Sequence, residues 1–211
     1  MQIRNWLAKW FTRGYVRMLN FNGVSREEPY QANGEKQDVF WVNAENWPFA
    51  GQYTLFGTIL LNEHRLNDAP DDIVDYVFLH EVGHAKLPTI IGLITIFIRL
   101  PLLILAIIGV PALIARWIGF AFSSPSIDQF LVFSAITVLM ILLILVPMIT
   151  IWWLDEGHAE LFVVSKLGVK EYKKRHEIVD DYADRDFITR LIRWTLYPNP
   201  EHVVWVANRR S

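Results

Sequence analysis

The chain has 211 residues, of which 53% are hydrophobic, and a formal net charge of −2. The length suits one domain or one domain with an insertion, and the hydrophobic share exceeds that of a typical soluble protein, which indicates membrane association. The scattered, nearly balanced charges argue against nucleic-acid binding, and the absence of cysteine excludes disulfides and leaves His, Asp and Glu as metal ligands.

The first segment, residues 1–22, is expected to form an amphipathic helix that lies on the membrane surface. Lys9, Arg13 and Arg17 fall on one side of this helix and suit an anionic leaflet. The other side gathers the apolar residues Ile3, Leu7, Trp10, Phe11, Met18 and Leu19. Because basic residues interrupt the apolar run, no signal peptide is expected. The alternative is a helix that packs on the domain.

Residues 23–87 are expected to form the first part of a catalytic domain. A polar loop is predicted over 22–36, and two β-prone pieces follow at 39–42 and 53–61, separated by turn residues. A small sheet therefore precedes the next helix. Its edge strand could bind an extended peptide through main-chain hydrogen bonds, although a purely structural hairpin is equally compatible with the pattern.

The next helix is predicted to begin within residues 68–71, with Asp68 as the cap, and to end or kink at Pro88. It contains His80-Glu81-Val82-Gly83-His84, the H-E-x-x-H pattern. One helical turn separates the two histidines, so both imidazoles can bind one zinc ion while Glu81 reaches the water molecule that zinc activates. This pattern is the core of a zinc hydrolase, and it requires a third ligand.

Two apolar stretches, 89–122 and 127–153, each exceed the roughly 20 residues that a bilayer span requires. With the short turn at 123–126 they predict a transmembrane hairpin within residues 88–153. Basic residues cluster before and after this hairpin at Lys9, Arg13, Arg17, Lys166, Lys170, Lys173, Lys174 and Arg175. Because cytoplasmic segments are enriched in such residues, both termini and the active site are expected on the cytoplasmic side.

The last segment, residues 154–211, would complete the catalytic domain and contains Asp155-Glu156-Gly157-His158-Ala159-Glu160 near its start. Glu156 and Glu160 are four residues apart and share a helix face. Glu156 can therefore complete a His-His-Glu zinc site, and Glu160 can orient a ligand histidine through its free ring nitrogen. Asp155 is the competing candidate for the third ligand.

These motifs together resemble the integral-membrane zinc endopeptidases that include the heat-shock protease HtpX and the related CAAX prenyl protease. That family has H-E-x-x-H, two membrane helices, then E-x-x-A-D and a helix that ends in Leu-Gly. This chain has its histidine motif, the hairpin, Glu156-Gly157-His158-Ala159-Glu160 and Leu167-Gly168 in the same order, within residues 39–168. The resemblance implies an α-helical membrane protein with a small β-sheet, in which a two-helix transmembrane hairpin interrupts a zincin-like catalytic domain.

The resemblance also implies roles for residues outside the zinc motif. Asn43-Ala44 is similar to the family's substrate-binding edge segment. The chain departs from the family at Glu160, where Asp is usual, and at Tyr197-Pro198-Asn199-Pro200, where the family has His-Pro-Pro. Tyr197 and His202 are therefore the candidates for the contact with the oxyanion.

The expected function is zinc-dependent hydrolysis of peptide bonds, with His80, His84 and Glu156 as ligands and Glu81 as general base. The expected partners are a membrane-associated peptide or protein substrate and the lipid bilayer. One alternative is a site-2-type intramembrane metalloprotease that uses Asp155. Another is a membrane scaffold that binds metal without proteolysis. The remaining histidines, His64, His158 and His176, are expected to face solvent.

Overall fold

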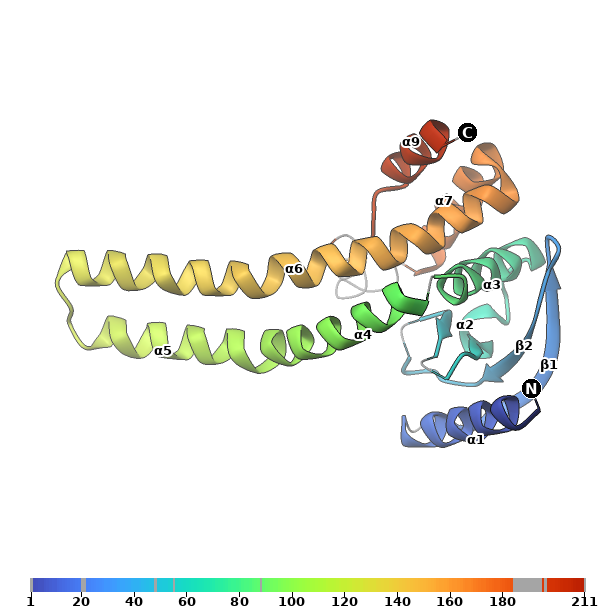
Figure 1. Ribbon diagram of the computed structural model, residues 1–211, viewed down its shortest axis with the longest axis horizontal. Coiled ribbons are helices and arrows are strands. Elements are labelled where there is room, and N and C mark those ends of the chain that lie inside the picture. The colour runs from blue at the N-terminus through green and yellow to red at the C-terminus, as the bar shows by residue number, and fades with distance from the viewer. Residues whose placement is uncertain are drawn as a thin grey trace. The chain divides into compact units, whose positions relative to one another are not determined.

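Figure 1 shows a computed structural model of the chain, which describes residues 2–19, 22–47, 49–54, 56–87, 89–183, 195 and 197–210. The chain forms two compact units. The sheet unit comprises Met1–Leu87 and Glu156–Ser211, and the hairpin unit comprises Pro88–Asp155. The described part is mostly helical with a small mixed sheet, as expected. Pro88, the expected end of the motif helix, lies outside the described residues.

The helices of the sheet unit are α1 (Gln2–Met18), α2 (Glu63–Leu66), α3 (Asp71–Ala85), α7 (Val169–Ala183) and α9 (Pro200–Arg210). The strands are β1 (Val24–Ala32), β2 (Glu35–Val42), β3 (Gly51–Tyr53) and β4 (Ile59–Asn62). They form a sheet in the order β1-β2-β4-β3, in which β2 and β4 are parallel and the other neighbours are antiparallel. Strands β1 and β3 are therefore the two edges.

The polar loop predicted over residues 22–36 is wrong, because this stretch forms β1, a tight turn and the start of β2. Asn33 and Gly34 form the turn with positive φ angles of 46° and 82°. An Asn-Gly pair at such a turn is a strong hairpin signal in a sequence. Pro29 is tolerated because β1 is an edge strand. The β-prone piece predicted over 53–61 is likewise not one strand, because it contains the last residue of β3, a turn and the first three residues of β4.

Strand β2 is buried on both faces, which explains its nearly continuous apolar end. Val39 and Trp41 belong to the hydrophobic cluster that contains α3, whereas Phe40 and Val42 pack with Val16 of α1. Figure 1 shows α1 and α3 on opposite faces of the sheet. The sheet thus supports α3, the helix that carries the H-E-x-x-H motif.

Two of the three basic residues on the polar side of α1 pair with acidic residues of the sheet. Lys9 forms ion pairs with Glu27 and Asp38, and Arg13 donates to Glu27 at 2.8 Å. Strands β1 and β2 thus supply acidic partners for these two residues that the sequence pattern of one helix does not reveal. Arg17 is exposed.

Helix α3 begins at Asp71, so the expected capping role of Asp68 is wrong. Pro70 occupies the N-cap position, and its carbonyl accepts hydrogen bonds from the backbone N–H groups of Ile73 and Val74. Asp71 and Asp72 in the first turn favour the helix through its dipole. Ile73 and Val77, which precede the two histidines on the same side of α3, are 2% and 6% exposed.

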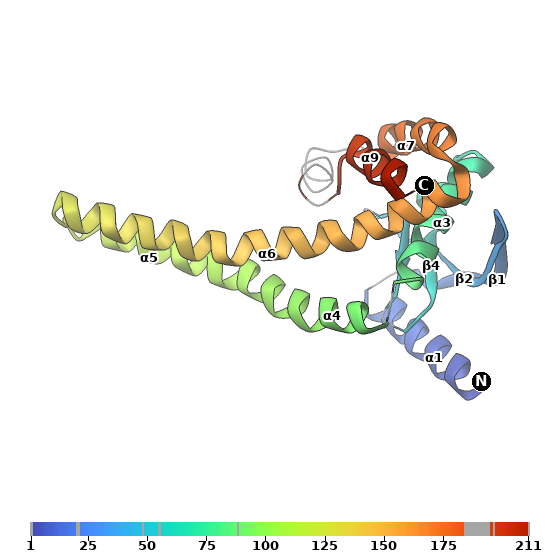
Figure 2. The ribbon, with the colours of Figure 1, turned by 45° about the horizontal axis from the view of Figure 1, so that its top comes forward.

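The hairpin unit consists of α4 (Thr89–Ile104), a π-helical turn η1 (Leu105–Gly109), α5 (Val110–Phe122) and the first part of α6 (Ile127–Leu167). Figures 1 and 2 show its two arms side by side. Phe97–Phe122, with 26 residues, and α6, with 41, are long and apolar enough to cross a membrane. Turn η1 lies just before Pro111, whose missing N–H leaves a carbonyl in η1 without its usual helical partner.

Candidate metal centre

The two histidines of α3 point into one small space. Nε2 of His80 lies 3.2 Å from Nε2 of His84, and the ring centroids are 4.9 Å apart. This proximity follows from their spacing of one helical turn. His80 is 8% exposed and His84 is partly buried, so the pair lies largely inside the sheet unit.

Glu156 of α6 completes a group of three that could hold a metal ion. Its Oε2 lies 3.2 Å from Nε2 of His80 and 3.7 Å from Nε2 of His84. Tetrahedral zinc with bonds of about 2.0–2.1 Å would separate its ligand atoms by about 3.3–3.4 Å. The three separations observed are close to this value, so the donor set fits zinc in both chemistry and spacing.

A buried oxygen of Glu156 supports this fit. Glu156 is 6% exposed, and its Oε2 accepts no hydrogen bond of good geometry from the described residues. A buried carboxylate oxygen without a donor is costly. A cation held between this oxygen and the two imidazoles would remove that cost.

Asp155, the competing third ligand, is engaged elsewhere. Arg99 Nη1 donates to Asp155 Oδ2 at 2.8 Å, and the same guanidinium lies 3.6 Å from the ring centroid of Trp152. Both contacts are internal to the hairpin unit. Among the described residues, the metal-binding group contains Glu156 and not Asp155.

The close approach of α3 and α6 brings Glu156 to the histidines. A Cβ atom added to Gly83 would lie 2.7 Å from Cα and 2.9 Å from the carbonyl oxygen of Ala159, which is fully buried. Glycine and alanine are therefore needed where the two backbones meet. The H-E-x-x-H motif contributes this glycine at one of its variable positions.

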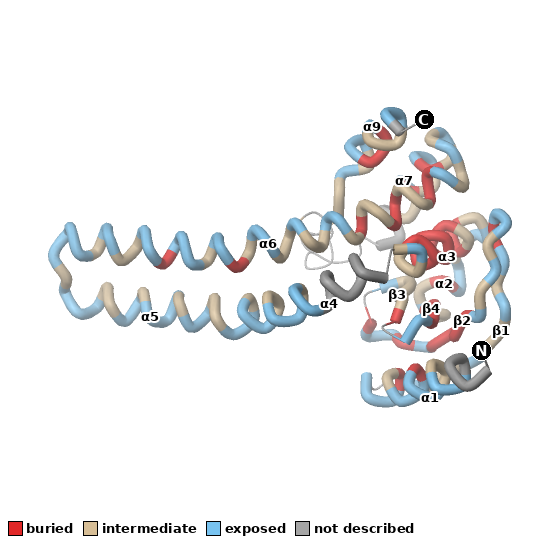
Figure 3. The backbone as a smooth tube through the Cα atoms, viewed as in Figure 1, coloured by how far each residue is buried: buried red, intermediate tan, exposed pale blue. Residues whose placement is uncertain are grey.

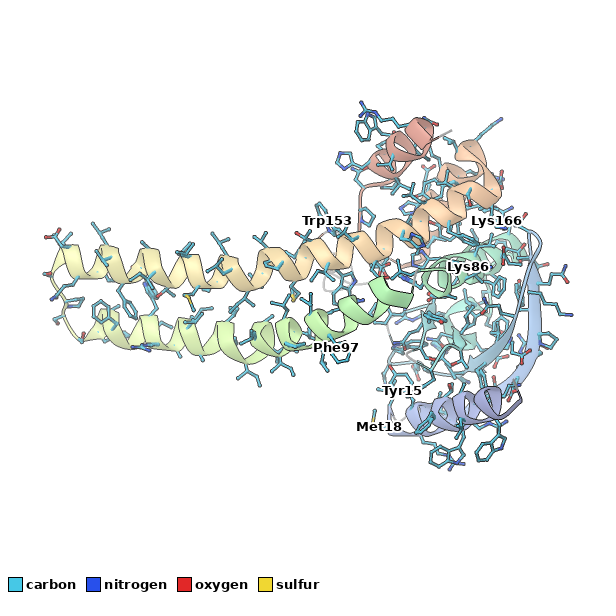
Figure 4. The ribbon with its side chains drawn as sticks, viewed as in Figure 1. Tyr15, Met18, Lys86, Phe97, Trp153 and Lys166 are labelled. Carbon is cyan, nitrogen blue, oxygen red and sulfur yellow. The ribbon has the colours of Figure 1, made fainter. Side chains whose placement is uncertain are left out.

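Two lysines at the C-terminal ends of the same helices pair with one glutamate of the sheet. Lys86 after α3 and Lys166 near the end of α6, both labelled in Figure 4, form ion pairs of 3.2 and 2.6 Å with Glu35. Glu35 begins β2, so one carboxylate of the β1–β2 hairpin pairs with a lysine from each of the two segments.

Glu160 orients His80 from the side opposite the metal-binding group. Oε1 of Glu160 lies 3.0 Å from Nδ1 of His80, and Tyr76 donates its hydroxyl proton to Oε2 of Glu160 at 2.7 Å. The Tyr76 hydroxyl also lies 2.8 Å from Nδ1 of His176. Because the hydroxyl has one proton and Glu160 accepts it, Nδ1 of His176 must carry the proton of the second bond.

The expected exposure of His176 is therefore wrong. His176 is 7% exposed and packs beside Tyr172, one turn earlier on α7. Tyr76 could have been found from the sequence, because it precedes His80 by one turn and so shares the face of the two histidines. The partner of Tyr76 on α7 depends on a tertiary contact that no local pattern encodes.

The electrostatics of this cluster favour a cation. Burial alone would lower the pKa of His80, but the carboxylates of Glu156 and Glu160 raise it well above its usual value. Burial would raise the pKa of both carboxyls, but the neighbouring His80 lowers that of Glu156 strongly and that of Glu160 to about 2. Two ionised carboxylates thus flank one imidazole, and a metal that binds Nε2 would replace the proton there.

Glu81 lies between the histidines and the edge strand β3. A Cβ atom on Gly51 would lie 2.8 Å from Oε1 of Glu81, so glycine allows the strand to approach the carboxylate. Glu81 is 6% exposed, and burial raises the pKa of its carboxyl, although the nearby His80 and His84 oppose this. A raised pKa suits a glutamate that must accept and then release a proton.

Of the two oxyanion candidates, the structure places Tyr197 near the histidines. Its ring stacks on His80 with 6.4 Å between the centroids and 25° between the planes. His202 lies in α9 and is exposed. Tyr197 is therefore the better placed of the two.

Asn43 and Ala44 follow β2, which is an inner strand of the sheet. The side-chain amide of Asn62 binds the backbone of Ala44 in both directions, accepting from its N–H at 3.3 Å and donating to its carbonyl at 2.9 Å. The strand that touches Glu81 is β3. Its Gly51 lies among the turn residues expected between the two β-prone pieces, and its contact with Glu81 joins segments that no local sequence pattern relates.

No family model, curated protein or solved structure matches this chain. Any function must therefore be inferred from the residues and their geometry.

Proposed function

We propose that the chain is a zinc-dependent endopeptidase with a zincin-like catalytic domain, held in a membrane by its hairpin unit. One observation carries the proposal: His80, His84 and Glu156 form a group that could hold a metal ion, and Glu81, a buried glutamate of the helix that carries the histidines, lies against an edge strand. When bound there, zinc supplies Lewis-acid chemistry, which lowers the pKa of water and polarises a carbonyl group.

Strand β3 provides a means to hold a peptide. It is an edge strand, so one side of its backbone can pair with an extended substrate through main-chain hydrogen bonds. Gly51 brings this strand against Glu81, which would place a scissile bond close to the carboxylate.

Glu81 acts in this mechanism as the proton carrier. Its carboxylate accepts a proton from the water molecule that attacks the carbonyl carbon, and delivers that proton to the amide nitrogen as the carbon–nitrogen bond breaks. The Tyr197 hydroxyl donates a hydrogen bond to the oxyanion that forms in between. Oε1 of Glu160, 3.0 Å from Nδ1 of His80, would hold the imidazole so that its Nε2 is directed at the cation.

The substrate class proposed is a protein or peptide in or near the membrane, cleaved on the cytoplasmic side. The two apolar helices support the membrane location, and the basic residues on both sides of the hairpin support the orientation. The engagement of Asp155 with Arg99 disfavours the site-2-type alternative, because that mechanism requires Asp155 as a ligand.

Glu81→Gln tests the mechanism. The variant should retain the metal, because Glu81 is not in the metal-binding group, and should lose about 10²–10⁴-fold in the rate of cleavage of an unfolded test protein, measured in detergent. Glu45→Gln, at an exposed position, is the control and should cleave at the wild-type rate. Wild-type cleavage by Glu81→Gln, or cleavage that a chelator leaves unchanged, would rule out the proposed mechanism.

A further inference from the structure

The outer side of α1 is unusually apolar for a helix at the surface of a folded unit. Trp6 is 63% exposed, Trp10 59%, Phe11 46% and Met18 74%. Met18, labelled in Figure 4, lies at the C-terminal end of the helix. Contiguous exposed apolar side chains of this size mark a surface that is covered in use.

The opposite side of the same helix packs on the sheet, and two basic residues of the helix pair with acidic residues there. Thr12 and Val16 are at most 1% exposed, and Lys9 and Arg13 are paired with acidic residues of β1 and β2. The charges of Lys9 and Arg13 are thus already compensated within the sheet unit. The outer side must act through apolar burial rather than through attraction between these charges and anions.

The apolar surface continues onto the turn between β3 and β4. Phe56 in this turn stacks on Phe11 with 5.3 Å between ring centroids. Beneath it, the hydroxyl of Thr58 lies 2.7 Å from that of Thr12 and 2.6 Å from that of Thr54. This chain of three buried hydroxyls ties α1 to the turn, so helix and turn form one surface.

We propose that Trp6, Trp10, Phe11, Met18 and Phe56 form a membrane-docking surface that inserts into the interfacial layer of a lipid bilayer. Tryptophan with other large apolar side chains is the composition that partitions into this layer. The same chain carries two helices long and apolar enough to cross a membrane, so a bilayer is the apolar phase available to it.

This docking goes beyond the proposed peptidase function and does not require it. If that function holds, docking would also set the position of the proposed substrate-binding strand. The β3–β4 hairpin reaches from Phe56 at the docking surface to Gly51 beside Glu81. The strand proposed to bind substrate would then lie at a fixed depth from the bilayer surface, which would favour membrane-proximal peptides.

The absence of cysteine from the chain allows a direct test. A nitroxide spin label is attached to Trp10→Cys in the full chain, reconstituted into phosphatidylcholine vesicles, and its collision rates with oxygen and with a water-soluble nickel chelate are measured. Lys36→Cys, exposed at the start of β2, is the matched control. We expect the label at position 10 to collide less often with the nickel chelate and more often with oxygen when vesicles are present. The label at position 36 should stay accessible to the nickel chelate. Met18→Cys repeats the test if the first variant fails to fold.

Three results would overturn the proposal. The first is a label at position 10 as accessible to nickel as the control. The second is shielding accompanied by spin–spin broadening that dilution with unlabelled chain removes, because a second copy would then cover the surface. The third is insertion that requires added phosphatidylserine, because charge rather than apolar burial would then hold the helix.

Discussion

The two units place polar and apolar side chains in opposite ways (Figure 3). In the sheet unit, the ionisable residues Glu81, Glu156 and Glu160 are 3% to 6% exposed. In the hairpin unit, Phe122 and Leu139 are 85% and 57% exposed. Buried charge is stable only with partners, and exposed apolar surface only outside water. The buried carboxylates of the sheet unit include one in a group that could hold a metal ion, and the apolar helices of the hairpin unit are long enough to cross a membrane.

The largest expected effect comes from replacing the glutamate of the candidate metal site. Glu156→Gln should reduce the metal content of the purified protein from about one ion per chain to nearly none, with loss of cleavage, because zinc needs three protein ligands. Asp155→Asn is the matched control one residue away. It should keep its metal, since Asp155 pairs with Arg99. The opposite pattern, measured by elemental analysis, would move the third ligand to Asp155.

The sequence alone identifies those site residues that lie close together along one helix. The pairs His80 and His84, and Glu156 and Glu160, follow from the helical repeat, and the hairpin follows from the length of two apolar stretches. The structure then brings His80, His84 and Glu156 together as predicted.

What the sequence did not reveal depends on contacts between distant segments. Gly51 meets Glu81, and Tyr76 meets His176, only because separate elements pack together. Lys9 faces acidic residues of the sheet for the same reason. Strand β1 is different, since the Asn-Gly turn after it was a readable signal that the polar composition of the stretch obscured.

The second test concerns the apolar exposure of the hairpin unit. Leu139→Asp, near the middle of the apolar part of α6, should raise the apparent free energy of membrane insertion by about 2.5–3.5 kcal/mol if that side chain faces lipid. Lys36→Asp on the sheet unit should change stability by no more than about 0.5 kcal/mol. Insertion can be measured by glycosylation of reporter sites in microsomes. No change for Leu139→Asp would contradict a lipid-facing position of this side chain.

The third test contrasts two helical glycines, one in each unit. Gly83→Ala should destabilise the sheet unit by about 1–3 kcal/mol, because the new methyl group would collide with the backbone of Ala159. Gly119→Ala in α5 has nothing within 4 Å of the new Cβ and should be neutral or stabilising by up to about 1 kcal/mol. Thermal unfolding in detergent measures both. Equal effects of the two substitutions would contradict the close contact of α3 and α6.

The smallest expected effect is the pH dependence of the metal-free sheet unit. The pKa of His80 is raised by folding, so its contribution to stability is complete below the usual value of 6.5 and is lost as the pH rises through the folded value. The pKa of Glu160 is lowered from 4.5 to about 2, so its contribution is complete above 4.5 and is lost as the pH falls towards 2. With a chelator present, this cluster should therefore contribute most between about pH 4.5 and 6.5.

Urea unfolding at pH 3, 5.5 and 8 would measure this pH window. One substitution tests its acid limit, and added zinc tests its alkaline limit. Glu160→Gln removes one of the two carboxylates beside His80, so it should weaken the loss of stability at acid pH. Added zinc should remove the loss at alkaline pH, because the cation takes the place of the proton on His80 and binds best where that proton is absent. Stability that falls steadily from pH 8 to 5.5 in the metal-free protein would contradict the charged state of His80, and with it the view that two carboxylates prepare this site for a cation.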